Sequence, residues 1–255
     1  LVSDWSSDVC SSDLVAAQTA ADADRLRAIG ARHAVVCGNL KFDVTPPTDK
    51  LRLGAHWRQL LGSRPVWLAA STREGEEVLL LDAFARLPYR HLLLLVPRHP
   101  QRFAEVAELI AARQLPSCRR SAGTLPDAET RVWLGDSMGE MPAYYALADL
   151  ALIGGTLLPF GGQNLIEAAA CGCPVLLGPH TFNFAQASAD AVGCGAAYRI
   201  ADADAAVAVA AELLQQPQAL ANMRAAASRF SQAHRGAAER TAALIEGLMA
   251  PRAGC

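Results

Sequence analysis

The chain has 255 residues, of which 52% are hydrophobic and 19% are charged, and its formal net charge is −2. This composition excludes a disordered polar chain and fits a globular protein with a sizeable core. The nearly balanced charge argues against a nucleic-acid binder, because such proteins usually carry a basic face.

The first residues differ from the rest of the chain. Residues 1–14, LVSDWSSDVCSSDL, have no apolar period and repeat the triplet Ser-Ser-Asp. They resemble translated adapter sequence at the end of an assembled DNA fragment, so we predict a non-native tail. The alternative is a disordered native tail. On the first interpretation the chain is truncated at its N-terminus, and residues 15–47 are the end of an N-terminal domain and a linker.

Helical periodicity alternates with short apolar segments from Val15 onward. Helical spacing over 20–30 ends at Gly30, a typical C-cap residue, and HAVVCG at 33–38 indicates a buried strand. Thr48 is then the expected N-cap of a helix over 48–62, with an apolar stripe that includes Trp57. This helix opens the main domain, which we predict to cover residues 48–232.

Within this domain, short strands that are apolar throughout are separated by helices. Such strands are typical of a parallel sheet that is covered on both faces, so we predict a doubly wound α/β, Rossmann-like fold. A helix over 233–255 follows. The predicted strands lie in the segments 65–72, 91–97, 131–135, 149–155, 174–178 and 196–200.

Sheets of this kind bind ligands at the carboxyl ends of their strands. Parallel strands would bring five loops to one rim of the sheet, and the unusual residues of the sequence gather there. These loops are Ser71–Gly75, Pro97–Pro100, Gly135–Glu140, Gly154–Gly162 and Gly178–Asn183.

The stretch PFGGQNLIEAAACGCPVLLGP, which begins at Pro159, points to a nucleotide. Gly161 and Gly162 let the backbone approach a ligand and turn into a helix, whose N-terminus suits a phosphate. Asn164 and Glu167 share one helix face, and the Glu167 carboxylate can accept hydrogen bonds from two ribose hydroxyls. The alternative is a glycine-rich turn in which Glu167 only stabilises the helix dipole.

Other rim residues leave two interpretations each. Arg98 directly follows an apolar strand and suits a phosphate, unless it is a surface arginine in a proline-shaped turn. Main-chain groups of 135–141 can contact a base edge; alternatively, Asp136 and Ser137 cap the next helix. Ser71 and Thr72 either donate to a ligand oxygen or form an N-cap box.

Two further features lie outside these loops. Lys41 stands between a domain end and the next domain, where a cation can face an interdomain cleft; the alternative is a solvated lysine. The seven cysteines have no zinc-ligand spacing, and we expect small buried residues rather than a redox or metal site.

Five motifs together resemble one enzyme family. GNLKFD, AASTREGEE, VPRHPQRF, LGDSMGEM and IGGTLLPFGGQNLIEAAACGCPVLLGPHTFNF are similar to segments of the 3-deoxy-D-manno-octulosonic acid (Kdo) transferases of lipopolysaccharide assembly. Gln163 stands where the family usually has histidine. The resemblance implies a GT-B glycosyltransferase fold, of which this chain would be the C-terminal, donor-binding half.

The resemblance also implies the reaction. Kdo would pass from CMP-Kdo to lipid IVA, a lipid A precursor, at the cytoplasmic face of the bacterial inner membrane, with no cofactor, metal or nucleic acid. Lys41 would stabilise the transition state. The CMP moiety would contact Pro97, Arg98, Met138, Gly139, Glu140, Asn164, Leu165, Ile166 and Glu167.

The family's general base and membrane anchor belong to its N-terminal half. We therefore expect this chain to bind CMP weakly and not to transfer Kdo by itself. One alternative is another GT-B nucleotide-sugar enzyme, such as a UDP-sugar transferase or an epimerase. A second is a nucleotide-binding regulatory module, in which Lys41 would be dispensable.

Overall fold

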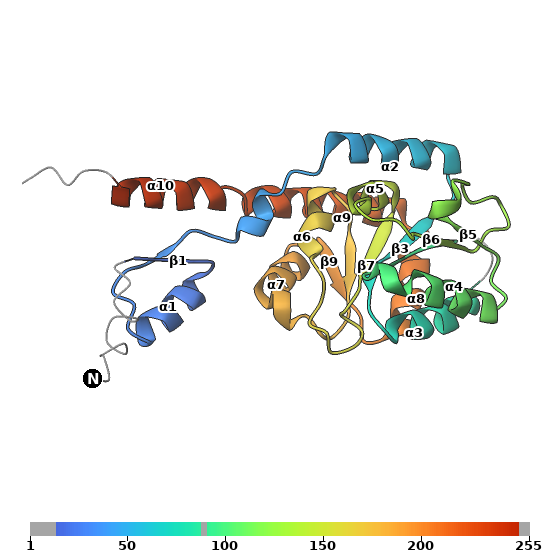
Figure 1. The fold of residues 1–255 in the computed structure, drawn as a ribbon, viewed down its shortest axis with the longest axis horizontal. Helices are drawn as coiled ribbons and strands as arrows, with labels where there is room; N and C mark the ends of the chain where they lie inside the picture. The colour runs from blue at the N-terminus through green and yellow to red at the C-terminus, as the bar shows by residue number, and fades with distance from the viewer. Residues whose placement is uncertain (1–13, 88–90, 250–255) are drawn as a thin grey trace, which may run out of the picture. The chain divides into compact units, whose positions relative to one another are not determined.

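The computed structural model describes residues 14–87 and 91–249. Contacts divide the chain into two compact units, one of residues 45–231 and the other combining 1–44 with 232–255 (Figure 1). Apart from Leu14, the segment predicted to be a non-native tail lies outside the described residues. None of the described helices is both long and apolar enough to cross a membrane.

The larger unit is built on a seven-stranded sheet with the order β5-β6-β4-β3-β7-β8-β9. All of its strand pairs are parallel, so the prediction of a doubly wound parallel sheet is confirmed. The strands are β3 (Val66–Thr72), β4 (Leu92–Pro97), β5 (Ser117–Arg119), β6 (Val132–Leu134), β7 (Leu150–Ile153), β8 (Val175–Leu177) and β9 (Ala197–Arg199).

Helices cover this sheet on both faces (Figure 1). Alternate strand residues such as Trp67 and Leu93 belong to one buried cluster with α3, α4 and α8. On the other face Trp57 and Tyr144 pack edge-on against Trp133. The helices are α2 (Thr48–Leu61), α3 (Glu76–Ala85), α4 (Phe103–Ala112), α5 (Met141–Leu147), α6 (Leu165–Ala170), α7 (Ala185–Gly193), α8 (Ala203–Leu213) and α9 (Pro217–Ala233).

The start of α2 differs by one residue from the prediction. Thr48 is the first helical residue, and Pro47 occupies the N-cap position without a side-chain hydrogen bond. The Pro47 carbonyl already accepts hydrogen bonds from the N–H groups of Lys50 and Leu51, both at 3.1 Å. The prediction of Thr48 as N-cap was therefore wrong, because the helical hydrogen-bond ladder begins one residue earlier.

The smaller unit contains β1 (Val15–Ala17), α1 (Ala20–Ala28), β2 (Ala34–Val36), the 3-10 helix η1 (Leu40–Asp43) and α10 (Ala237–Met249). β1 and β2 pair in parallel. The Asp43 carboxylate accepts hydrogen bonds from the N–H groups of Gly236 and Ala238, at 2.5 and 2.6 Å, and so caps the start of α10.

β2 was predicted to be a buried strand, and that is only partly right. Ala34 is buried, whereas Val35 and Val36 are 41% and 46% exposed. An apolar strand is buried throughout only where other elements cover both of its faces. In the described part of the smaller unit, β2 pairs with β1 and packs against α1, and this leaves its two valines accessible.

The order of the sheet places the ligand rim. In the sheet, β4, β6 and β5 lie outward from β3 on one side, and β7, β8 and β9 lie outward on the other. The chain forms the first side before β7 begins the second. The direction reverses between β3 and β7, which are hydrogen-bonded neighbours. In open α/β sheets, ligands bind at the carboxyl ends of strands at such a reversal. The loops after β3 and β7 therefore flank the expected site.

Candidate functional site

Main-chain groups of the two loops at the reversal are in close contact. The N–H of Gly154, just after β7, donates to the carbonyl of Ala70 in β3 at 2.8 Å. A Cβ atom at Gly154 would lie 2.3 Å from the carbonyl oxygen of Ser71. Only glycine fits at this point, so the floor of the site consists of backbone.

A buried carboxylate joins the same two loops. Glu76 is 0% exposed and accepts hydrogen bonds from the main-chain N–H groups of Arg73, Gly155 and Leu157. Burial raises the pKa of this carboxyl group above its usual range, although the main-chain hydrogen bonds oppose the shift. Glu76 was not among the predicted site residues.

Ser71 and Thr72, predicted to bind a ligand oxygen or to form an N-cap box, lie at the end of β3, just before the loop that Glu76 anchors. The Thr72 hydroxyl is buried and donates to the Glu77 carboxylate at 2.8 Å, so it is not directed at a ligand. The N-cap position of α3 belongs to Gly75, with no side-chain cap. Neither residue forms the expected N-cap box. The side-chain-to-backbone hydrogen bond of such a box is made instead by Glu76, whose carboxylate accepts from the N–H of Arg73 at 2.9 Å.

Asn164 and Glu167 meet at the start of α6, as the sequence predicts. Asn164 is the N-cap: its side-chain oxygen accepts from the N–H of Ile166 at 3.1 Å. Its side-chain nitrogen donates to Oε1 of Glu167 at 3.0 Å. Both side chains are half-buried, whereas the side chains of Leu165 and Ile166 are buried in the core. Those two residues have only main-chain groups to offer a ligand.

The glycines before α6 are required by contacts within the protein itself. Gly161 has a φ of 87°, and a Cβ atom there would lie 2.4 Å from the Phe182 ring and 2.5 Å from the Asn183 amide. The N–H of Gly162 donates to the carbonyl of Gly155 at 2.7 Å. The close approach at Gly161 is therefore to a neighbouring loop, and the Gly162 N–H is already used within its own loop.

Arg98 reaches toward the loop before α6. Its Nε donates to Oε1 of Gln163 at 3.2 Å, and its main-chain N–H donates to the carbonyl of Thr72 at 2.9 Å. The side chain is exposed and makes no ion pair with any residue that the structure describes. The preceding Pro97 is buried. The positive charge of Arg98 thus faces solvent at the rim.

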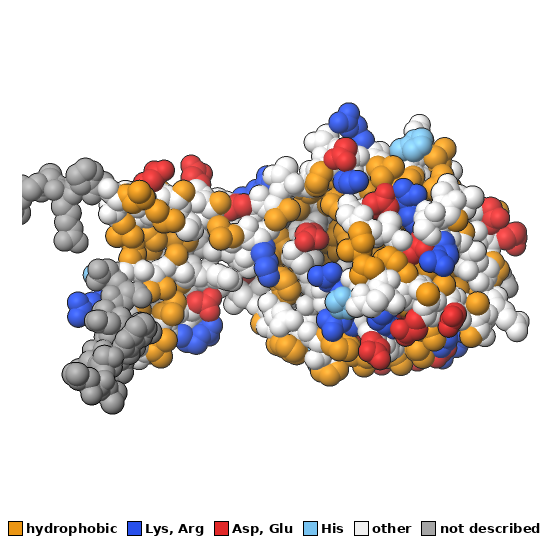
Figure 2. All heavy atoms as spheres, viewed as in Figure 1, with side chains coloured by type: hydrophobic (Ala, Val, Ile, Leu, Met, Phe, Trp, Pro, Cys, Tyr) orange, Lys and Arg blue, Asp and Glu red, His pale blue; other side chains and the backbone are white. Residues whose placement is uncertain are grey.

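Two more arginines lie at strand ends without a carboxylate partner in the described part of the chain. The Arg73 guanidinium lies 4.5 Å from the centroid of the Phe160 ring. Arg199, the last residue of β9, donates to the hydroxyl of Thr181 at 3.1 Å. Figure 2 shows that basic side chains on the visible face of the 45–231 unit are interspersed with acidic and apolar ones. Arg73, Arg98 and Arg199 therefore give the rim a local positive charge, although the formal net charge of the whole chain is −2.

The loop after β6 is anchored by a second buried acid. Asp136, whose side chain is 1% exposed, accepts from Arg119 Nε at 2.7 Å and from the N–H and hydroxyl of Ser121. Burial raises the pKa of Asp136, but these hydrogen bonds outweigh it and the pKa is lowered. The alternative in which Asp136 and Ser137 cap α5 was wrong, since Glu140 holds the N-cap position.

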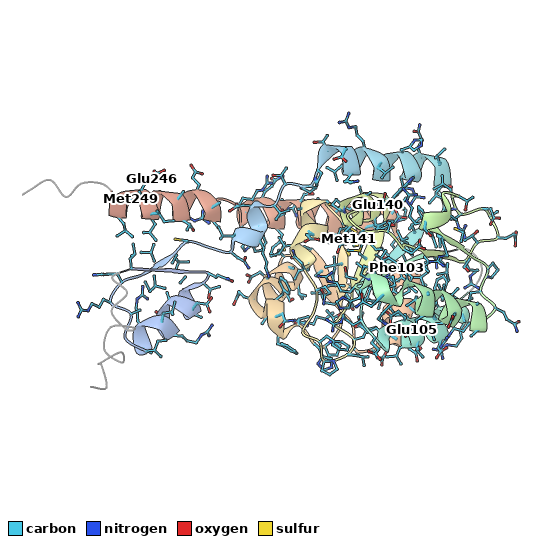
Figure 3. The ribbon with its side chains drawn as sticks, in the orientation of Figure 1. Phe103, Glu105, Glu140, Met141, Glu246 and Met249 are labelled. Carbon is cyan, nitrogen blue, oxygen red and sulfur yellow. The ribbon has the colours of Figure 1, made fainter. Side chains whose placement is uncertain are left out.

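The other predicted residues of this loop differ in accessibility. Glu140, labelled with Met141 at the start of α5 in Figure 3, accepts from Arg120 at 3.0 Å and from the Ser137 hydroxyl at 2.5 Å. Its carboxylate is thus occupied, whereas Met138 and Gly139 are exposed. In this loop the residues available to a ligand are those two.

Lys41 belongs to the other unit. It lies in η1, its side chain is exposed, and its main-chain N–H donates to the Asn39 side chain at 3.0 Å. The larger unit therefore brings together the predicted CMP contacts on the loops after β4, β6 and β7, and Lys41 is not part of that unit.

No set of three His, Cys, Asp or Glu side chains within the described ranges is arranged to hold a metal ion. Cys173 is buried and Cys171 is partly buried. Burial raises the pKa of each of these thiols to about 12. A reactive thiolate needs a lowered pKa, so these two residues fit the expected role as small packing residues. Cys194 is exposed, so the expectation of buried cysteines was wrong for that residue.

Comparisons with known proteins show which families this chain resembles. Residues 78–230 match the family model described as Glycosyl transferases group 1. The 3-deoxy-D-manno-octulosonic acid transferase of Bordetella pertussis is 48% identical over 92% of this chain and 56% of its own length. The enzyme of the same name from Haemophilus influenzae is 40% identical over 68% of this chain and 42% of its own length. The chain thus spans about half the length of these relatives.

A solved structure is similar to most of this chain. The C-terminal CMP-Kdo binding domain of WaaA from Acinetobacter baumannii has a TM-score of 0.69 and 33% identity to this chain. The match covers 73% of this chain and 100% of that domain. This similarity confirms the GT-B, Rossmann-like fold that the motifs predict.

Proposed function

This chain belongs to the Kdo transferases, within the group 1 glycosyl transferases, and we propose that its larger unit binds the CMP part of CMP-Kdo during transfer of Kdo to lipid IVA. The observation that carries the proposal is Arg98: an exposed guanidinium at the sheet reversal, without a carboxylate partner among the described residues, beside the loop that leads to Asn164 and Glu167.

In this proposal, CMP is held by three groups on the rim. Arg98 binds the phosphate through the fixed donor fork of its guanidinium. Glu167 accepts hydrogen bonds from ribose hydroxyls, and its bond to Asn164 fixes the orientation of the carboxylate. The exposed backbone at Met138 and Gly139 contacts the base. Pro97, Glu140, Leu165 and Ile166 shape these contacts through packing and main-chain groups.

The chemistry places charge on the departing phosphate. As the bond between Kdo and CMP breaks, the phosphate gains negative charge, and preorganised donors stabilise that charge by about 3 kcal/mol each. We propose that Arg98 and Lys41 supply these donors, so that the reaction needs no metal or cofactor. A chelator should then leave unchanged both CMP binding by this chain and Kdo transfer by a protein that combines it with an N-terminal domain.

The general base, acceptor binding and membrane binding are proposed for the part of the relatives that this chain does not span. An inverting transfer needs a general base for the acceptor hydroxyl. We propose that an acidic residue of an N-terminal domain supplies it, and that the same domain binds lipid IVA and the inner membrane at its cytoplasmic face. The chain by itself should bind CMP weakly and not transfer Kdo.

Calorimetric titration of the chain with CMP and with UDP tests the donor assignment. We expect CMP to bind more tightly than UDP. Tighter binding of UDP would favour a UDP-sugar enzyme of the same fold, and binding of neither nucleotide would contradict the proposal.

A further inference from the structure

Glu76 lies at the reversal of the sheet and uses both carboxylate oxygens to hold main-chain N–H groups. Oε2 accepts from Arg73 at 2.9 Å and from Gly155 at 2.7 Å, and Oε1 accepts from Leu157 at 2.9 Å. Arg73 belongs to the loop after β3, while Gly155 and Leu157 belong to the loop after β7. One side chain therefore connects the two loops that flank the expected site.

Thr156 lies between Gly155 and Leu157, two of the three residues whose amides Glu76 holds, and it extends the connection to a third loop. Its hydroxyl is buried, accepts from the N–H of Gly178 at 3.0 Å and donates to the carbonyl of Ile153 at 2.5 Å. Its carbonyl accepts from the N–H of His180 at 3.0 Å. The loop after β8 is thereby fixed to the loop after β7.

The same network reaches the proposed CMP contacts. The carbonyls of Gly154 and Gly155 accept from the N–H groups of Gln163 and Gly162, at 2.9 and 2.7 Å. Gln163 in turn accepts from Arg98 and directly precedes Asn164. The positions of Arg98 and Asn164 thus depend on a loop that Glu76 anchors.

The geometry fits an ionised Glu76, since both of its oxygens accept hydrogen bonds from N–H groups. Because burial raises the pKa of Glu76 in the fold, the folded chain binds this proton more tightly than the unfolded chain does. This group's contribution to stability therefore falls as the pH rises through its folded pKa. A buried acid that lowers stability when it is ionised is better explained by ordering a site than by stabilising the fold.

We propose that Glu76 is a positioning residue of the donor site, which, together with Thr156, holds the loops after β3, β7 and β8 in the arrangement that binds CMP. This inference rests on the proposed function, because it names what orders the same site. Neither residue needs to touch the nucleotide. Their effect is exerted through the main chain of residues 154–163.

The first test compares Glu76→Gln with Glu77→Gln in the whole chain. Glu77 is equally buried but bonds Thr72 and Arg102 instead of the loop after β7. In Glu76→Gln an amide NH2 replaces one acceptor oxygen and faces N–H donors. We expect hydrogen exchange at Gly155 and Leu157 to accelerate about tenfold and CMP affinity to fall about tenfold, with little change in melting temperature.

The control variant should give the opposite pattern. Glu77→Gln should lower the melting temperature, because it weakens a buried ion pair, and leave exchange at Gly155 and Leu157 unchanged. If Glu76→Gln keeps wild-type exchange and wild-type CMP affinity, the inference is overturned while the proposed function stands. If the wild-type chain binds no CMP, the proposed function fails, and the exchange measurement still decides whether Glu76 orders the loops.

A second pair of variants does not alter the buried acid. Thr156→Ser keeps the hydroxyl that bonds Gly178, and Thr156→Val removes it at nearly the same volume. We expect CMP affinity to survive in Thr156→Ser and to fall about tenfold in Thr156→Val. Equal affinities in the two variants would contradict the role of Thr156, even if Glu76→Gln failed to fold.

Discussion

Arg98 donates from its Nε to the side-chain oxygen of Gln163, joining the loop after β4 to the loop before α6. Strand β3 lies between β4 and β7 in the sheet, so this contact connects loops from strands that are not neighbours. It keeps the guanidinium at the reversal of the sheet, where its remaining N–H groups are available to an anion.

Arg98→Ala should weaken CMP binding about 10- to 100-fold, because charge-assisted hydrogen bonds contribute about 1.5–3 kcal/mol each. Calorimetry on the chain measures this change. Arg113→Ala is the matched control: Arg113 is paired with Asp82 and follows the carboxyl end of α4, whose first turn is marked by Phe103 and Glu105 in Figure 3. An equal loss of affinity in the two variants would show that Arg98 has no specific role.

Glu167 should be responsible for recognition of the ribose. The wild-type chain is expected to bind CMP about tenfold more tightly than 2′-deoxy-CMP, because a hydroxyl that donates to a carboxylate contributes more than 1 kcal/mol. In Glu167→Ala this difference between the two nucleotides should disappear, while overall affinity falls. A penalty for the deoxy nucleotide that persists in the variant would assign ribose recognition to another group.

Lys41 should act on turnover and not on CMP binding. A chimera joins this chain to the N-terminal half of the Bordetella pertussis relative, which the chain does not span, and radiolabelled transfer to lipid IVA measures its activity. We expect Lys41→Ala to reduce the rate about 100-fold, as for loss of one transition-state donor, with CMP affinity unchanged. Full activity of the variant would show that Lys41 does not stabilise the transition state, and transfer by the unfused chain would refute the proposal that the general base belongs to the N-terminal half.

Acid should weaken the loop after β6 through Asp136. Its pKa is lower in the fold than in the unfolded chain, so its stabilising contribution is present above the ordinary value of 3.8 and is lost as the pH falls through the folded pKa. Asp136→Asn should destabilise the chain by about 2 kcal/mol at pH 7, and the difference from wild type should shrink in strong acid. Urea unfolding between pH 2 and 7 measures it; a difference independent of pH would contradict the assignment.

The thiols should differ in reactivity. Burial raises the pKa of Cys171 and of Cys173 to about 12, so little thiolate forms until the solution is strongly alkaline. Iodoacetamide at pH 8 should label the exposed Cys194 and spare these two residues, as determined by peptide mass spectrometry. Rapid labelling of Cys171 or Cys173 in the folded chain would indicate a redox or metal role.

Much of the fold could be predicted because its signals are local. The apolar run of β4 is entirely buried, as its composition indicates, and the parallel order follows from strands alternating with helices. β5 was not predicted: Cys118 is the only hydrophobic residue in Ser117–Arg119, and pairing with β6 at the edge of the sheet is what makes this segment a strand. Pairing with a distant segment produces no recognisable pattern of hydrophobic residues in a strand of three residues.

The site residues also divide into those with a local sequence signal and those that depend on contacts between distant segments. Arg98, Asn164 and Glu167 were predicted because their residue types stand directly at strand or helix ends. Glu76 was missed because a glutamate in the first turn of a helix usually lies at the surface. The available signal was its spacing of three from Arg73, which is that of a capping box, but its bonds to Gly155 and Leu157 span about 80 residues of sequence.

The contact between Gly154 and Ser71 has a consequence for how this protein can change over evolution. Because a Cβ at Gly154 would meet a main-chain oxygen at 2.3 Å, no change of rotamer can relieve the clash. A saturation library should therefore lose every replacement at Gly154, while the exposed Met138 and Phe182 tolerate many. New donor preferences in descendants of this protein would have to arise from the side chains around the rim, while the main-chain contact between the loops after β3 and β7 stays the same.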